Sequence, residues 1–214
     1  NAVLQILQDV TRSANESETV EEALLAALER IAQYNGWQIG HAWKRADDES
    51  GEFVSTGIWH VTDDATQVIG KLEEFQQISA QCRMAPGEGL IGRLLETGRP
   101  QWVDDIEHFD DWQPGAAAEL GLHAAIAFPV VVDEHVAAVL EFFSDHPTQR
   151  EERFLEIMPD VGIQLGHVIE RKQLERDLAE AVVEQQRYFA SQLHDSVQQQ
   201  LTGVILLGET LKGE

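Results

Sequence analysis

Apolar residues recur every three or four positions near the start of the chain, which is typical of amphipathic helices. This spacing predicts one helix over residues 1–12 and a second over 19–35. Thr19 and Glu22 have the spacing of a capping box, in which each side chain accepts a hydrogen bond from the other residue's backbone. Gly36 follows the last residue of the pattern and favours the left-handed backbone that ends a helix. The N-terminal part of the chain is therefore predicted to form two helices.

The middle of the chain changes to strand-like segments separated by turn residues. The expected strands span residues 37–46, 53–62, 101–103, 124–132 and 136–143, with a helix over 67–80 and a polar loop over 105–121. The last two strands are joined by the tight turn Asp133-Glu134-His135, so they are expected to form an antiparallel hairpin. Pro129 removes a backbone donor, so its strand must be an edge or carry a bulge at that point.

A long helix is predicted after the hairpin. Thr148 and Glu151 are spaced as a second capping box, and no glycine or proline interrupts residues 167–202. A helix of that length extends past any globular core, so its apolar stripe predicts a homodimer through parallel helices in a coiled coil or bundle.

The end of this helix carries a histidine beside its apolar stripe. With about 100° per residue, the stripe consists of Phe189, Leu193, Val197, Leu201, Val204, Leu207 and Leu211. His194 lies at the stripe's edge, whereas Asp195 and Gln199 point away from it. A neutral imidazole nitrogen is a nucleophile, and a neighbouring carboxylate orients the ring or accepts its proton. The pattern therefore indicates a histidine presented to a reaction partner.

These residues resemble the phosphoacceptor helix of two-component sensor histidine kinases, in the subfamily with the motif His-Asp-x-hydrophobic-x-Gln that signals to LuxR-type response regulators. The resemblance implies that His194 is the phosphoacceptor and Asp195 its base. It also implies that Gln199 positions water when phosphate is removed from the regulator. ATP and Mg²⁺ would be bound by a kinase domain that the 214 residues do not include. This fragment is accordingly expected to be inactive alone.

Residues 19–170 resemble a GAF domain, an α+β fold with a six-stranded antiparallel sheet, flanking helices and a ligand pocket. The likeness rests on Pro-Gly-Glu-Gly-Leu-Ile-Gly-Arg at 86–93, Gly-Arg-Pro at 98–100 and Leu-Glu-Phe-Phe-Ser at 140–144. The expected divisions are an upstream linker helix (1–18), a GAF sensory domain (19–165), a signalling helix (166–187) and the truncated first helix of the phosphoacceptor domain (188–214).

The charge and the cysteine count disfavour several classes of partner and activity. A net charge of −23 disfavours direct contact with nucleic acid or an anionic membrane. Cys82, the single cysteine, rules out an internal disulfide and suits a reducing cytoplasm, although an upstream membrane anchor on the full-length protein stays open. GAF enzymes that reduce free methionine sulfoxide need several cysteines, so that activity is disfavoured.

Candidate ligand-binding residues are Trp43, Trp59, His123 and Phe143, which lie in or beside predicted strands. Trp102 and Trp112 are further aromatic candidates, although any of these rings is also an ordinary core residue. Haem is an alternative ligand of the domain. His123 is the first candidate for its axial ligand, and His41 and His60 are the next candidates. No metal site is expected.

Two other features have ordinary structural readings. Cys82 lacks the neighbours that accompany bilin-binding cysteines, so it is expected to be a packed thiol. The series Gly87-x-Gly89-x-x-Gly92 matches a dinucleotide fingerprint, but no strand precedes it, so a loop entering a helix is expected instead.

Two functional hypotheses follow. The first is the GAF input domain and phosphoacceptor helix of a sensor histidine kinase. The alternative is a non-catalytic, dimerising GAF module that controls another output, with His194 incidental. An ATP-binding domain in the downstream sequence distinguishes the first hypothesis from the second.

Overall fold

The structure is a computed structural model that describes residues 2–63, 65, 69–106, 109 and 121–212. Side chains are described for these residues except 2–4, 69, 193, 195–197 and 199–212. The chain divides into two compact units, 1–172 and 173–214.

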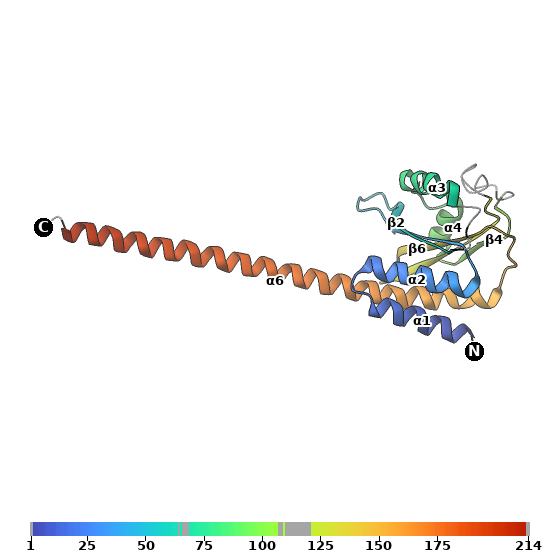
Figure 1. The fold of residues 1–214 in the computed structure, drawn as a ribbon, viewed down its shortest axis with the longest axis horizontal. Coiled ribbons are helices and arrows are strands. Elements are labelled where there is room, and N and C mark those ends of the chain that lie inside the picture. The colour runs from blue at the N-terminus through green and yellow to red at the C-terminus, as the bar shows by residue number, and fades with distance from the viewer. Residues whose placement is uncertain (1, 64, 66–68, 107–108, 110–120, 213–214) are drawn as a thin grey trace. The chain divides into compact units, whose positions relative to one another are not determined.

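The first unit is built around a six-stranded sheet with the order β3-β2-β1-β6-β5-β4 (Figure 1). Every strand pair is antiparallel. The strands are β1 (Ile39–Arg45), β2 (Phe53–Val61), β3 (Arg83–Met84), β4 (Gln101–Val103), β5 (Ala124–Val132) and β6 (His135–Ser144). The helices are α1 (Ala2–Glu16), α2 (Val20–Asn35), α3 (Ile69–Gln81), α4 (Gly89–Thr97) and α6 (Glu152–Lys212), of which α6 continues into the second unit. The predicted sheet and its α+β class are confirmed.

The sheet has an apolar core on each face, because alternate residues of a strand point to opposite sides. On one face, Ile126, Leu140 and Phe142 pack with buried residues of α1, α2 and the first part of α6. On the other face, Val139 and Phe143 pack with residues of α3 and α4. Figure 1 shows α1, α2 and the start of α6 on the side of the sheet away from α3. The two faces are therefore covered by different helices.

The predicted helix at the N-terminus is present and longer than expected. Along α1, Val10 and Ala14 are fully buried and Ile6 is nearly so, all within the core that α2 shares. This helix therefore packs as part of the first compact unit.

Local sequence signals explain where α2 begins and ends. The backbone N–H of Glu22 donates to Thr19 Oγ1 at 3.1 Å, and the reciprocal bond to the Glu22 carboxylate completes the capping box. Gly36 ends the helix in the left-handed conformation at φ 68°. Both predictions for this helix are confirmed.

The hairpin of β5 and β6 also follows the prediction. Its two turn residues, Asp133 and Glu134, have φ of 46° and 64°. Positive φ at both central residues is the requirement of the hairpin turn whose twist matches that of the strands. The ring of His135 donates from Nδ1 to the Asp133 carbonyl at 2.6 Å. Here non-glycine residues accept a conformation that glycine or asparagine usually supplies.

The predicted capping box at the start of α6 is wrong. The helix begins at Glu152, which makes Glu151 the N-cap residue and leaves Thr148 three positions too early. The Glu151 carbonyl accepts the N–H groups of Phe154 and Leu155, both at 3.1 Å. Within the described part of the chain, the buried Thr148 Oγ1 has no hydrogen-bond partner.

Helix α6 lies against the backbone of β5 at two glycines. A Cβ atom added to Gly162 would come within 2.0 Å of the Pro129 carbonyl oxygen, and one on Gly166 within 1.7 Å of the Val131 carbonyl oxygen. Strand β4 pairs only with residues 125–127 of β5, so Pro129 lies on a free edge, as predicted. Only glycine permits this close approach of helix and strand.

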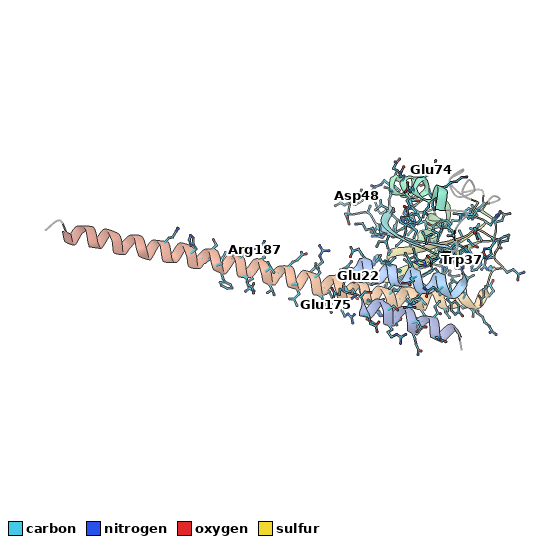
Figure 2. All side chains as sticks on the ribbon, in the orientation of Figure 1. Glu22, Trp37, Asp48, Glu74, Glu175 and Arg187 are labelled. Carbon is cyan, nitrogen blue, oxygen red and sulfur yellow. The ribbon has the colours of Figure 1, made fainter. Side chains whose placement is uncertain are left out.

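The second unit consists of the rest of α6. Its side chains project from a single helix, as Glu175 and Arg187 show in Figure 2. Large apolar side chains on it are exposed, among them Leu174 and Leu178 at 63% and 67%. No helix in the described ranges is long and apolar enough to cross a membrane.

The glycine contact is testable by one methyl group. We expect Gly162→Ala to lower the free energy of unfolding by about 1–3 kcal/mol or more, because the added Cβ overlaps the Pro129 backbone. The control is Gly70→Ala in α3, where a Cβ meets nothing within 4 Å and alanine should stabilise by roughly 0.5–1 kcal/mol. Urea unfolding measures both. Equal stability of the two variants would contradict the proposed contact.

Candidate functional site

Aromatic side chains gather on the face of the sheet that α3 and α4 cover. Trp43, Trp59 and Phe143, three of the predicted ligand-binding residues, all belong to or pack on this core. Phe75 of α3 links them, because its ring centroid lies 5.5 Å from Trp59 and 5.3 Å from Phe143, edge-on in both cases. The sequence thus identified residues that the fold brings together, although it missed Phe75.

Trp102 lies elsewhere. It packs on the core of the opposite face, with its ring edge-on to Trp37 at 5.4 Å. Of the two alternatives for Trp102, the structure fits the ordinary core residue, because the alternation of β4 turns it to the other side of the sheet. Trp112 lies outside the described residues.

A row of polar side chains crosses the same face as Trp43. His41 pairs with Trp59 on one side and Glu141 on the other. His41 is fully buried and Glu141 is 4% exposed. The imidazole stacks on Trp59 at 3.7 Å between centroids, and Trp43 Nε1 donates to Glu141 Oε2 at 2.9 Å. A carboxylate is thus held inside an aromatic environment, which is costly unless it is paired.

His41 connects this carboxylate to Ser55. Its Nε2 and the Ser55 Oγ are 2.8 Å apart, whereas Nδ1 is 3.9 Å from Glu141 Oε2. The order of groups is that of a serine nucleophile, its base and an orienting acid. The 3.9 Å separation is too long for a hydrogen bond, and Ser55 Oγ also accepts the N–H of Gly57 at 3.1 Å. The arrangement therefore binds polar atoms together and does not form a nucleophilic triad.

Burial shifts the pKa values of His41 and of the nearby core residue Cys82. Desolvation lowers the pKa of His41, although Glu141 opposes the shift, so the ring favours its neutral form. Desolvation also raises the pKa of Cys82, and the negative charge of Glu141 raises it further. Both effects favour the protonated thiol, and Cys82 is half-buried against the aromatic core, in line with the packed thiol expected from sequence.

The histidines considered for haem lie in different settings. The Nε2 of His41 is occupied by Ser55, which leaves that ring unsuited to axial ligation. His60 is half-buried, and burial lowers its pKa. The backbone of His123 donates to Ser144 and accepts from Ile106, and its side chain is half-buried. Haem binding through His123 stays a prediction.

Glu141 and Ser55 are the site residues that sequence reasoning missed. Glu141 stands inside the apolar run of β6, and its alternation places it on the same face as Phe143. A single acidic residue inside a buried strand was the available signal, because such residues are almost never fully buried unless paired. Ser55 carried no such signal.

The glycine-rich loop has a structural role. The Gly87 N–H donates to the Gly92 carbonyl at 2.9 Å, and a Cβ on Gly92 would come within 2.3 Å of the Ala85 carbonyl oxygen. The loop therefore folds tightly on the first turn of α4, as the loop-into-helix interpretation predicted. Among the described residues, no three His, Cys, Asp or Glu side chains gather as metal ligands.

In the second unit, His194 is exposed on α6. The side-chain amide of Gln198 donates from Nε2 to His194 Nε2 at 3.0 Å. If the amide donates, this bond occupies the lone pair of His194 Nε2, so that lone pair is free for attack only once the bond opens. The side chains of Asp195 and Gln199 lie outside the described residues. Gln198 was missed, although its i+4 spacing from His194 was the signal.

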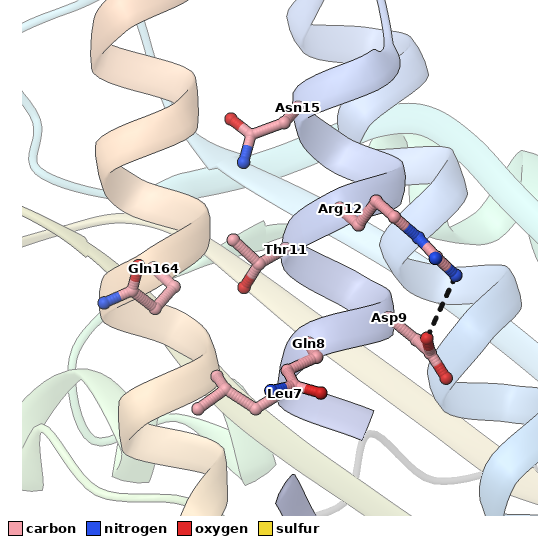
Figure 3. A pocket seen from close by; sticks show the side chains of 7 residues that line it. All are labelled: Leu7, Gln8, Asp9, Thr11, Arg12, Asn15 and Gln164. Atoms are coloured by element: carbon pink, nitrogen blue, oxygen red, sulfur yellow. Dashed lines mark hydrogen bonds and ion pairs between the residues drawn. The ribbon is translucent and has the colours of Figure 1, made fainter. Parts of the chain in front are cut away.

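One open hollow of about 580 Å³ lies between α1 and α6 (Figure 3). Its lining residues are Leu7, Gln8, Asp9, Thr11, Arg12, Asn15 and Gln164. Arg12 and Asp9 are paired at 3.2 Å within it. This hollow presents self-paired surface groups and lies on the other side of the sheet from Glu141, so we assign it no ligand.

Residues 17–170 match the GAF domain family. The chain therefore contains a GAF domain and belongs to that family, whose domains are small-ligand-sensing regulatory modules. No curated protein matches the chain.

Solved GAF structures are similar in fold. A free methionine-R-sulfoxide reductase from Neisseria meningitidis is 17% identical at a TM-score of 0.62, over 81% of this chain and 91% of that chain. The GAF domain of a phosphoenolpyruvate-protein phosphotransferase from Coxiella burnetii is 21% identical at a TM-score of 0.61, over 83% of this chain and 99% of that chain. The GAF domain of A. aeolicus nlh2 is 17% identical at a TM-score of 0.58, over 80% of this chain and 97% of that chain. These identities establish a common fold only.

The buried imidazoles predict acid sensitivity. Folding lowers the pKa of His41. Below about pH 6.5, the imidazole is therefore protonated in the unfolded chain while it stays neutral in the folded state. Stability is therefore full above that pH and falls as pH decreases toward the folded pKa. The lowered pKa of His60 contributes in the same direction.

We expect His41→Gln to flatten this decline, measured as urea-unfolding free energy between pH 5 and 8. His167→Gln, at an exposed histidine of α6, is the control for removing an imidazole at the surface. An unchanged slope in the His41 variant would contradict the assignment.

Proposed function

We propose that this chain is the sensory and phosphoacceptor part of a two-component sensor histidine kinase. In this proposal the GAF domain binds a small ligand, and the bound state controls phosphorylation of His194 and transfer to a response regulator of the LuxR type. The observation that carries it is an exposed histidine on a long helix that begins inside the GAF core.

The environment of His194 supports the phosphoacceptor role. Its Nε2 lies 3.0 Å from the side-chain amide of Gln198, a contact that must open before this nitrogen attacks a phosphate. The exposed ring leaves room for the γ-phosphate of ATP that a kinase domain would deliver. Asp195 as base and Gln199 as water-positioning residue remain part of the proposal, by resemblance to the family motif.

Contacts near the end of the first unit support a route for the signal. Lys172 is buried on α6, and its ammonium donates to the carbonyl of Ser17, just after α1. Arg171 donates to Asn15 Oδ1 at 2.9 Å. Cations at a helix C-terminus are favoured by the helix dipole. A change in the GAF core would therefore reach α6 where it leaves that core, and would shift its register or crossing.

The alternative is a dimerising GAF module with another output. The fold comparisons include GAF domains of phosphotransferases and a reductase, so the fold alone fits several outputs. The GAF reductases act on free methionine sulfoxide, whereas Cys82 is the single cysteine here and is half-buried. Nothing in the site favours that chemistry.

The proposal includes a homodimer through the exposed stripe of α6. Replacing Leu174 and Leu178 with glutamate should convert the dimer to monomer at micromolar concentration, because charges then face each other across the seam. Sedimentation measures the change. The control replaces Gln173 and Ser191 with glutamate, which adds the same charge on the helix face away from the stripe. Monomer in the wild type, or dimer in both variants, would contradict this arrangement.

The phosphoacceptor role has its own test. Supplied in trans with the ATP-binding domain of a histidine kinase and Mg-ATP, the 214-residue chain should gain an acid-labile, base-stable phosphate, as a phosphoramidate on histidine is. His194→Ala should abolish the label. Asp195→Asn should slow transfer by roughly 10²–10⁴-fold, the usual contribution of a positioned base. Gln199→Ala should spare phosphorylation and weaken removal of phosphate from the regulator.

Gln192→Ala, an exposed glutamine two residues before His194, is the matched control and should label normally. Label that persists in the His194→Ala protein, for example on His167, would overturn the assignment.

A further inference from the structure

The carboxylate of Glu141 lacks a cationic partner within the described part of the chain. Its one ion-pair contact there is His41 at 3.9 Å, and burial favours the neutral form of that imidazole. No lysine or arginine among the described residues forms a salt bridge with it. A buried carboxylate without a counter-charge is costly, and proteins retain such groups mainly where they bind something.

The two oxygens of Glu141 differ. Oε2 accepts the indole N–H of Trp43 and faces His41. Oε1 accepts no hydrogen bond from the residues that the structure describes, and 6% of the side-chain surface stays accessible to solvent. A carboxylate oxygen has two lone pairs, so Oε1 is an open acceptor.

His41 does not neutralise this carboxylate. Burial favours the neutral form of its imidazole, and its Nδ1 lies 3.9 Å from Glu141 Oε2, too far for a hydrogen bond. Nδ1 is buried and has no hydrogen-bond partner among the described groups. Among the described residues, the indole N–H of Trp43 is therefore the one hydrogen-bond donor to Glu141, and it lies on Oε2.

The surroundings of the carboxylate suit an apolar body with a positive charge. Trp43, Trp59 and Phe143 supply ring faces and edges on the same side of the sheet. Aromatic rings attract cations through their quadrupole, more strongly where water is excluded. The net charge of −23 raises the local concentration of small cations around the protein and repels anions.

We propose that the GAF site binds a small primary amine, with its ammonium on Glu141 Oε1 and an apolar or aromatic body against Trp43, Trp59 and Phe143. This inference rests on the proposed sensory function and specifies the chemical class of its ligand. It involves no covalent step, because the amine is bound and released unchanged.

The test compares amines with alcohols of the same shape, on the 214-residue protein. The probes are phenethylamine, tryptamine and hexylamine, paired with 2-phenylethanol, tryptophol and 1-hexanol. Calorimetric titration at pH 7.5 should show at least one amine binding tenfold or more tightly than its alcohol, because only the amine forms a charge-assisted hydrogen bond. The bound amine should also slow alkylation of Cys82 by iodoacetamide, since that side chain packs on the same aromatic core.

Two variants distinguish amine binding at Glu141 from non-specific attraction of the amine to an acidic protein. Glu141→Gln should remove the preference for the amine and leave the affinity for the alcohol within about twofold. Glu74→Gln removes the same charge from an exposed position of α3 beside Phe75 and should keep the full preference. If the Glu141 variant does not fold, the amine–alcohol comparison and Cys82 protection in the wild type decide the matter.

Three results would overturn the proposal: no amine in the panel binds at millimolar concentration, each alcohol binds as tightly as its amine, or Glu141→Gln retains the preference. Binding is measured without ATP or a kinase domain. Failure here therefore leaves the His194 assignment standing, and failure of His194 labelling leaves the amine site standing.

Discussion

The close contact of α6 with β5 is the constraint on which the rest of the first unit depends. Gly162 and Gly166 have no side chains, so the helix lies against the carbonyl groups of Pro129 and Val131. That approach lets Val161 and Leu165 enter the core of one sheet face. The same helix thus packs on the sheet in the first unit and carries His194 in the second.

The opposite face of the sheet has a different character. There a carboxylate, an imidazole and a hydroxyl lie among aromatic rings, and their hydrogen bonds are only partly satisfied. Partly satisfied polar groups in a low dielectric are unfavourable for stability. A GAF domain that only filled its core would be better served by apolar residues at Glu141 and His41. This cost is the reason for proposing that the polar row binds a ligand.

The two faces meet in the strands themselves. Strand β6 places Glu141 on the face that α3 and α4 cover, while its neighbours Leu140 and Phe142 enter the core shared with α2 and α6. In the proposed function, a ligand bound at Glu141 would act on residues that pack against those two helices. On the helical side, Lys172 and Arg171 tie α6 to the end of α1. The arrangement offers a short physical connection between the site and the helix, through side chains of one strand.

The sequence by itself determined the secondary structure where local chemistry decides it. The capping box at Thr19, the hairpin turn at Asp133 and the uninterrupted helix through His194 follow from residues close in the chain. It placed Trp43, Trp59 and Phe143 on candidate strands, but it left the face of Trp102 open and misplaced the start of α6, because strand faces and cap positions depend on exact registers. Only the tertiary structure brought Glu141, His41 and Ser55 together. Their contacts join β6 to the neighbouring strands β1 and β2, which lie much earlier in the chain, and no local pattern encodes such a pairing.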